Sequence, residues 1–266
     1  MPFCRRLTRF RRESAISFSH KLLIEVALLL SERVSMFLSR KKDEGVNVLV
    51  LGCRDGRVAD ELQPFLSQAD KVYQCDVSPS ILSSTNGACC IVADDEALPF
   101  RERSFDFLVS NLTLHNINDL VMVLTRFRSL LRPGGLFFAA TFGNATLRDV
   151  KKAVIKTEGE RIVARIQPFN YVSEWPMLLR KCGFQDIVVD VNLIEVSYDS
   201  LYHLFKDLKS MGEGNTFRKL YEPIGRRALD RAWDIYKESV GWKTEGPVPV
   251  CFEIAILKGN NKPWCP

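Results

Sequence analysis

The stretch that decides the fold is Val48–Leu49–Val50–Leu51–Gly52–Cys53–Arg54–Asp55–Gly56. Its four leading apolar residues predict a buried strand, and the two glycines predict a tight turn into a helix. In a parallel sheet such a turn lies at the carboxyl end of the strand, where ligands bind. A plain strand–helix turn without a ligand is the alternative that this stretch alone leaves open.

Short apolar runs alternate with helical patterns on either side of this stretch. Strands are expected at 46–51, 71–76, 88–92, 105–110, 136–142, 186–191 and 248–257. Helices are expected at 16–40, 56–66, 79–85, 120–131 and 175–182. Strands that are apolar on both faces and separated by helices predict an α/β fold with a mostly parallel sheet covered on both sides. The last strand is expected to run antiparallel, at or near an edge.

The same pattern predicts how the chain is organised. We expect a basic N-terminal helical extension at 1–44, a core at 45–195, an inserted helical cap at 196–246, a final core strand at 247–258 and a tail at 259–266. The cap is inferred from its polar, helical composition.

Composition narrows the class of protein. The 266 residues are 46% hydrophobic and 26% charged, which is typical of a globular chain and excludes a disordered or collagen-like one. No apolar run reaches the length of a membrane span. Residues 1–42 carry ten basic and three acidic side chains, whereas the remainder carries 27 and 29, so nucleic-acid binding is not expected. The eight cysteines form no CxxC pair and no metal-ligand spacing with the three histidines, which favours a reducing compartment and no metal.

The basic N-terminus has two interpretations. Five arginines and no acidic residue precede Glu13, as in a mitochondrial transit peptide. The arginines run into a helical apolar stripe from Leu22 to Leu38, which favours a folded helix. We therefore expect a bacterial cytoplasmic location, or the mitochondrial matrix if the segment is a transit peptide.

Acidic residues follow the next two strands. Asp76 ends the strand at 71–76, and a carboxylate there can accept both hydroxyls of a ribose. Asp94 and Asp95 follow the strand at 88–92, where an acid can accept a hydrogen bond from an exocyclic amine. Helix or turn caps are the alternative at each position. Three sites at three strand ends favour adenosine binding.

Together these motifs resemble class I S-adenosylmethionine-dependent methyltransferases. The resemblance rests on 49–53, Asp76, 94–100, 104–106, 110–115 and the turn Leu131–Arg132–Pro133–Gly134–Gly135. It implies a Rossmann-like seven-stranded sheet and S-adenosylmethionine as cofactor. The cofactor-binding residues that it implies are Gly52, Cys53, Arg54, Gly56, Asp76, Val77, Asp94, Asp95, Asn111 and Leu112. The methionine part would lie beside 52–56, the ribose at Asp76, the adenine at Asp94 and the backbone of Asp95, and the pocket floor at 111–112.

Later segments resemble one subgroup of this family. They are 140–147, 166–169 and 208–215, together with the basic start at 10–15. The subgroup contains the malonyl-carrier-protein O-methyltransferase of biotin synthesis and a methyltransferase-like assembly factor of respiratory complex I, which is associated with arginine hydroxylation. The resemblance favours the assembly-factor branch, with a protein or acyl-carrier-bound acceptor as partner. A carrier-protein methyltransferase and a non-catalytic binding protein are the alternatives.

Two positions depart from the family pattern. Val50 stands where an acid is usual, and Arg54 stands where a glycine is usual. Arg54 could bind a carboxylate of the cofactor or of a substrate, or could be a solvated loop side chain. His115 is the candidate catalytic residue, as a general base, with a structural histidine at a helix start as the alternative.

Overall fold

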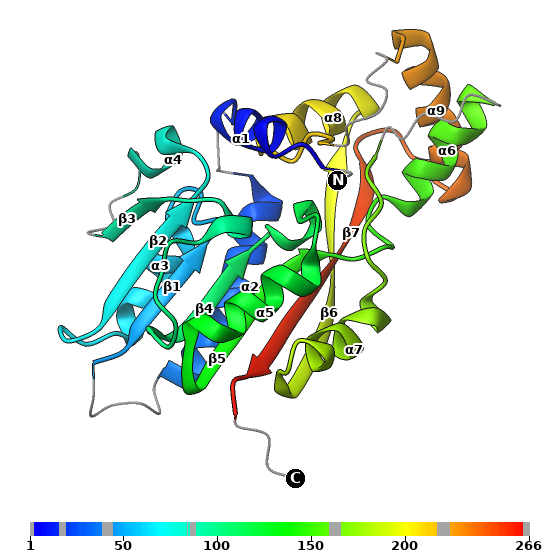
Figure 1. Ribbon diagram of the computed structural model, residues 1–266. Coiled ribbons are helices and arrows are strands. Elements are labelled where there is room, and N and C mark those ends of the chain that lie inside the picture. Colours follow the sequence, from blue (N-terminus) through cyan, green and yellow to red (C-terminus); the bar gives the residue numbers. More distant parts are fainter. Residues whose placement is uncertain are drawn as a thin grey trace.

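A seven-stranded sheet in the order β3-β2-β1-β4-β5-β7-β6 forms the centre of the molecule (Figure 1). The structure, a computed structural model, describes residues 3–15, 20–38, 45–83, 85, 89–159, 166–216 and 224–262. The strands are β1 (Asn47–Leu51), β2 (Lys71–Asp76), β3 (Cys89–Val92), β4 (Phe105–Asn111), β5 (Leu131–Phe142), β6 (Gln185–Tyr198) and β7 (Val248–Asn260). β7 pairs antiparallel with β5 and β6, and the other neighbours pair in parallel. The expected sheet is therefore confirmed, with its antiparallel strand next to the edge.

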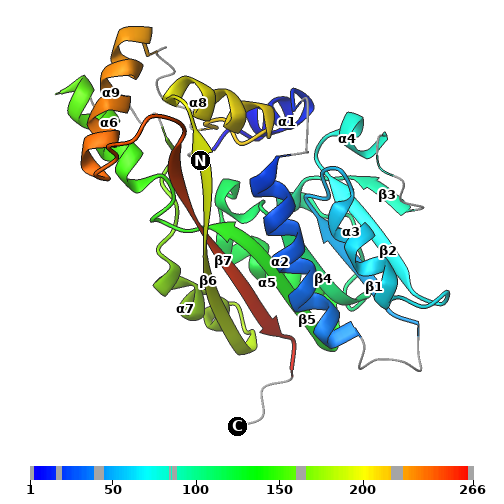
Figure 2. The same ribbon diagram turned by 180° about the vertical axis from the view of Figure 1, so that it is seen from behind.

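Helices cover both faces of the sheet. They are α1 (Arg5–Glu13), α2 (Lys21–Leu38), α3 (Arg57–Leu62), α4 (Pro79–Ser83), α5 (Leu120–Leu130), α6 (Arg148–Glu158), α7 (Trp175–Lys181), α8 (Leu201–Ser210) and α9 (Arg226–Ser239), with short 3-10 turns η1 (Gln63–Phe65), η2 (Asp95–Ala97), η3 (Leu114–Asn116) and η4 (Val172–Glu174). Figure 2 shows α2 and α3 in front of the sheet, and Figure 1 shows α5 and α7 on the opposite face.

Alternating residues of the strands supply the two cores. Val48 and Val50 of β1 pack with the buried side of α2, whereas Leu49 and Leu51 pack with α5 and α7. Every residue of β4 is buried, as expected of a central strand with helices on both sides. The apolar stripe of the sequence is the buried face of α2, so the helix expected at 16–40 is confirmed over 21–38. Residues 16–19 and 39–44 lie outside the described residues.

Several boundaries differ from the sequence expectation. β6 continues to Tyr198 rather than ending at 191, so its last three residues fall in the segment expected as the cap. The sequence there alternates polar and apolar residues, as an edge strand exposed on one face does. β5 begins at Leu131, so the strand includes the segment expected as a turn at 131–135. Helix α6 was not expected, and Ala88 of the third expected strand lies outside the described residues.

The carboxyl ends of the parallel strands meet α1 and α8. Both views show these two helices beside each other across that edge of the sheet (Figures 1 and 2). The backbone N–H of Cys4 donates to the carbonyl of Thr216 at 3.1 Å, which ties the start of α1 to the segment after α8. The N-terminal helix is therefore part of the enclosure around the strand ends.

Candidate cofactor site

The turn after β1 is shaped by backbone conformations that suit glycine. Gly52, Arg54 and Gly56 all have positive φ, of 64°, 53° and 84°. A side chain at Gly52 would place its Cβ 2.3 Å from the Thr113 Cγ2 atom, because the turns after β1 and β4 touch there. Strand order reverses between these two strands, and the crevice at such a reversal is where open α/β sheets bind ligands.

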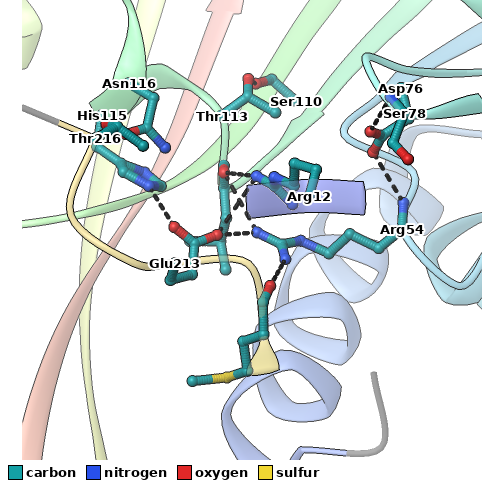
Figure 3. A network of polar contacts seen from close by, with 12 residues as sticks. Arg12, Arg54, Asp76, Ser78, Ser110, Thr113, His115, Asn116, Glu213 and Thr216 are labelled. Atoms are coloured by element: carbon teal, nitrogen blue, oxygen red, sulfur yellow. Dashed lines mark hydrogen bonds and ion pairs between the residues drawn. The ribbon is translucent and has the colours of Figure 1, made fainter. Parts of the chain in front are cut away.

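Asp76 lies at the end of β2, directly beside this turn. It is buried, its Oδ1 accepts the N–H of Ser78 at 3.1 Å, and its Oδ2 accepts the N–H of Arg54 at 3.4 Å (Figure 3). The carboxylate therefore holds both the β1 turn and its own turn. Each oxygen keeps capacity for another donor, since a carboxylate offers about four lone-pair sites.

Two acids follow β3, and they have different roles. Asp94 caps η2 by accepting the N–H of Glu96 at 3.0 Å, and its carboxylate also pairs with Arg5 of α1. Asp95 contacts the pocket described below, and burial raises the pKa of Asp95 to about 6, although Arg5 and Thr113 oppose the shift. The side chain of Asp94, which was expected to contact the adenine, is thus a cap paired with Arg5, and the acid in the pocket wall is Asp95.

The turn after β4 carries the remaining predicted residues. Asn111 and Leu112 are buried, and Leu112 has a positive φ of 51°. The Asn111 Oδ1 atom has no hydrogen-bond partner within the described part of the chain. The carbonyl of Leu112 accepts a hydrogen bond of 2.9 Å from Arg12 Nη2. This turn thus presents backbone and side-chain acceptors at the strand end.

One pocket brings some of these residues together. It is narrow, with a cavity volume of about 20 Å³, and is lined by Arg5, Thr8, Arg12, Gly52, Asp76, Val77, Asp95, Thr113 and Asn116. Four predicted cofactor residues are in its wall: Gly52, Asp76, Val77 and Asp95. The predicted residues outside its lining are Cys53, Arg54, Gly56, Asp94, Asn111 and Leu112.

The pocket wall also contains residues that the sequence motifs did not indicate. Arg5, Thr8 and Arg12 come from α1, one helical turn apart, and form one side of the pocket. The sequence shows a basic N-terminus, but nothing in its local pattern indicates which surface it covers. Thr113 and Asn116 lie beside the motif residues of β4 and could have been found from that proximity.

Next to the pocket, two guanidinium groups and an imidazole converge on Glu213 (Figure 3). Arg12 Nη2 lies 3.4 Å from Glu213 Oε1, Arg54 Nη2 forms an ion pair with the same oxygen, and His115 Nε2 lies 2.8 Å from Oε2. The side chains of Arg12, Arg54, His115 and Glu213 are 4%, 1%, 1% and 3% exposed. The alternative of a solvated Arg54 is therefore wrong. We call these four residues the Glu213 cluster.

Electrostatics in this cluster favour an ionised carboxylate. Burial by itself raises the pKa of Glu213, but His115, Arg12 and Arg54 outweigh it and hold the pKa of Glu213 well below its usual range. Burial and the neighbouring charge of Arg12 lower the pKa of Arg54. An uncharged Glu213 would leave buried cations without a counter-charge, which is unfavourable.

A second buried network connects the cap side to the turn after β4. The Oδ1 of Asn116 accepts hydrogen bonds from Gln167 Nε2 at 3.1 Å and from Thr216 Oγ1 at 3.0 Å. His115 also packs against the rings of Phe142 and Phe169, at 4.9 and 5.8 Å between centroids. Segments around 115, 167 and 213–216 therefore form one wall.

Comparisons with known proteins identify the family. The family profile described as "Methyltransferase domain" matches residues 49–139. The zebrafish (Danio rerio) mitochondrial arginine-hydroxylase NDUFAF5 is 33% identical over 220 residues, which are 79% of this chain and 67% of that protein. The chain belongs to the class I S-adenosylmethionine-dependent methyltransferase family.

Two further proteins are similar to the chain. The malonyl-[acyl-carrier protein] O-methyltransferase 1 of Coxiella burnetii is 32% identical over 168 residues, covering 63% of this chain and 57% of that protein. The structure of the Bacillus subtilis YcgJ protein matches with a TM-score of 0.57 at 12% identity, over 88% of this chain and 100% of that one, which shows the shared fold. The chain spans 60–67% of the length of the NDUFAF5 proteins that it matches.

None of the helices in the described ranges is both long enough and apolar enough to span a membrane.

Proposed function

We propose that the chain binds S-adenosylmethionine at the carboxyl ends of β1, β2 and β3. The observation that carries this proposal is the pocket whose wall contains Gly52, Asp76, Val77 and Asp95. These residues come from three successive strand ends, which is the arrangement that reads a nucleoside in open α/β sheets. Membership of the methyltransferase family supports the same ligand.

The donor and acceptor chemistry of the pocket fits the adenosine part of this cofactor. The Asp76 carboxylate keeps lone pairs for two ribose hydroxyls, because Ser78 and Arg54 each use only one site on it. Asp95, with Asp94 beside it, supplies an acceptor for an exocyclic amine. Cys53 and Gly56 belong to the turn that would pass beside the methionine part, with 111–112 as the floor.

When bound, this cofactor supplies an electrophilic methyl group on a sulfonium. The chain's own part would then be to position an acceptor and exclude water, which provide much of the rate in such displacements. His115 is proposed as the general base. Its Nε2 is held by Glu213, and its buried Nδ1 has no partner in the described part of the chain, so Nδ1 is the atom able to accept a proton.

The acceptor is proposed to be a side chain of a partner protein, in the branch of the complex I assembly factor. The names of the NDUFAF5 relatives support an arginine side chain as the group acted on. A malonyl group on an acyl carrier protein is the second candidate, favoured by the similarity to the Coxiella enzyme. A binding protein that uses the same pocket without methylating is the third.

One experiment tests cofactor and acceptor together. The purified chain is first titrated calorimetrically with S-adenosylmethionine, and absence of binding would contradict the proposal. It is then incubated with the cofactor and with either a malonyl-carrier protein or arginine-containing complex I subunits. Mass spectrometry distinguishes a modified arginine side chain, a methylated malonyl group and no change, which correspond to the three candidates.

A further inference from the structure

A hollow with a volume of about 650 Å³ borders the exposed side of α2. It is lined by α2, by the segment of α3 and η1, and by the middle of β6. Figure 2 shows this side of the molecule, with α2 between α3 and the edge of the sheet that β6 forms. None of its lining residues lines the candidate cofactor pocket. We call it the α2–β6 face, and the residues that matter below are Glu25, Leu28, Glu32, Glu61, Phe65 and Leu193.

The α2–β6 face exposes apolar side chains and buries unused polar atoms. Leu28, Phe65 and Leu193 are 44%, 48% and 65% exposed. Ser31 also lines the face and is 4% exposed, yet its Oγ has no hydrogen-bond partner among the described residues. The same holds for the Nδ2 of Asn192. Grouped exposed apolar side chains mark surfaces that bind another molecule, and buried polar atoms without partners are rare. Both observations indicate that the face is incomplete by itself.

The charge of the face is negative. Its lining has no Lys or Arg among the described residues, and its carboxylates are those of Glu25, Glu32 and Glu61. Lys21 lies 3.6 Å from Glu25, and Arg33 lies 3.5 Å from Glu32 while also pairing with Asp190 at 3.1 Å. Glu61 has no ion pair within the described part of the chain. Two basic groups therefore stand against four carboxylates, so a complementary partner is basic.

The backbone of β6 is available for pairing at this face. β6 is the last strand of the sheet, and among the described residues it pairs with β7 alone. Leu193 lies opposite Glu253 of β7, whose carbonyl accepts the N–H of Gly143 at 2.8 Å on the β5 side. Because Glu253 directs its backbone groups away from β6, Leu193 directs its own N–H and C=O out of the sheet. Two residues further, the carbonyl of Glu195 accepts a hydrogen bond of 3.2 Å from Lys21 Nζ, which agrees with this orientation.

We propose that the α2–β6 face binds an extended segment of a partner protein, which adds to β6 as a further strand and alternates basic with apolar side chains. Strand addition satisfies the outward backbone groups that recur at 191, 193 and 195. Side chains of the added strand point alternately to the two faces of the sheet. Those on the side of α2 meet Glu25 and Glu32, which favours Lys or Arg. Those on the other side meet Val191, which is 51% exposed and lies opposite Ala255 of the core under α5 and α7.

A second copy of this chain fits the face less well. A symmetric contact between two copies would bring the same acidic surface against itself, and like charges that face each other are destabilising. The proposal goes beyond the cofactor pocket, because the two sites share no lining residue.

The first test measures binding of a model segment to the full chain. The probe is a fluorescent peptide of about nine residues, a common strand length, in which arginine and valine alternate. Fluorescence anisotropy should show saturable binding that weakens as NaCl is raised from about 0.05 M to about 0.5 M. A peptide with glutamate in place of arginine should not bind. A peptide N-methylated at every arginine and valine keeps the side chains but has lost the donors, so it should not bind either.

Protein variants locate the binding. Glu25→Lys combined with Glu32→Lys should weaken binding of the arginine–valine peptide by about tenfold or more. Asp234→Lys combined with Glu238→Lys, at exposed positions of α9, makes the same change in net charge and is the matched control. Leu193→Pro should also prevent binding, because it removes an outward N–H and leaves the ladder with β7 intact. Circular dichroism verifies folding, and the N-methylated peptide tests the same backbone contact without any substitution.

The contrary outcomes are equally specific. Equal affinities of the two double variants would show that the peptide binds elsewhere and would overturn the proposal. Undiminished binding of the N-methylated peptide would exclude strand addition. A dimer in sedimentation equilibrium that Leu193→Pro dissociates would assign the face to a second copy instead. Each of these results leaves the cofactor proposal intact, because calorimetric titration of S-adenosylmethionine tests that proposal on separate residues.

Discussion

The guanidinium of Arg54, in the turn after β1, forms an ion pair with the carboxylate of Glu213, 159 residues further along the chain. This pair joins the turn after β1 to the segment after α8, and Arg12 of the N-terminal helix contacts the same oxygen of Glu213. One carboxylate therefore connects three segments that are remote in sequence and lie at the strand ends.

Removing the charge of Glu213 should destabilise the protein strongly. Glu213→Gln removes the carboxylate that two buried guanidinium groups share, and breaking a buried pair in this way typically costs about 3–5 kcal/mol. Denaturant unfolding measures the loss. Adding Arg54→Gly to Glu213→Gln should recover part of it, because one unpaired charge is removed. Glu238→Gln, at an exposed site on α9, is the control, and equal stability of the two single variants would contradict the role of the cluster.

Gly52 is expected to tolerate no side chain, for reasons of space as well as conformation. In Gly52→Ala the new Cβ would lie 2.3 Å from Thr113 Cγ2 and 2.7 Å from the Asn111 carbonyl. Gly134→Ala is the matched control, since Gly134 has a φ of 78° and nothing within 4 Å of an added Cβ. The control should lose about 1–2 kcal/mol of unfolding free energy from the backbone alone. Gly52→Ala should lose clearly more, and similar losses would refute the close approach of the two turns.

The carboxyl group of Asp95 should make stability depend on pH. Its pKa is raised to about 6, mainly by burial, so the folded state holds the proton more tightly than the unfolded state. The unfolding free energy should therefore decrease as pH rises from about 4 to about 6 and stay lower above that range. Asp95→Asn should remove this decrease and be more stable than the wild type at about pH 8, by on the order of 1–3 kcal/mol. Denaturant unfolding across this pH range measures both proteins, and parallel pH profiles would contradict the raised pKa.

Asp76→Ala should weaken S-adenosylmethionine binding by removing the acceptor for the ribose hydroxyls. A hydrogen bond to a charged group contributes about 1.5–3 kcal/mol, which corresponds to roughly 10- to 150-fold in affinity for each bond lost. Calorimetric titration measures the change, and Asp60→Ala at an exposed position of α3 provides the control. Asp76→Asn separates the roles of the residue, because its amide oxygen can still hold the N–H of Ser78. Unchanged affinity in both Asp76 variants would remove the ribose assignment.

The run at 105–110 predicted β4 well because every residue of that strand is buried. The run at 71–76 coincides with β2, and Asp76 lies at the strand end where the pattern indicated. The edge strand was underestimated because Ile194 to Tyr198 alternate between apolar and polar residues, which weakens the signal of a buried strand. Helix α6 is missing from the prediction, although its buried residues Val150, Ala153 and Val154 have helical spacing.

The cluster around Glu213 could not be predicted from local patterns. The segments that contain these residues have common local patterns: a basic helix for Arg12, a loop for Arg54 and a glycine-rich turn for Glu213. Their contacts depend on the tertiary structure, because the Arg54–Glu213 pair is buried only when α1 and the segment after α8 cover the sheet. The departure from glycine at Arg54 was the one visible signal, and it suggested carboxylate binding without indicating Glu213 or Arg12.

The N-terminal helix also has a kinetic consequence. Arg5 and Arg12 of α1 line the pocket, and they also hold Asp94, Leu112 and Glu213, so α1 must release several contacts before a nucleoside can reach Asp76. Association should then be governed by how often the helix lifts rather than by diffusion. In stopped-flow experiments the observed rate should level off at high nucleoside concentration. A cofactor that has been captured would dissociate slowly, so exchange of spent for fresh cofactor would set the pace of repeated turnover.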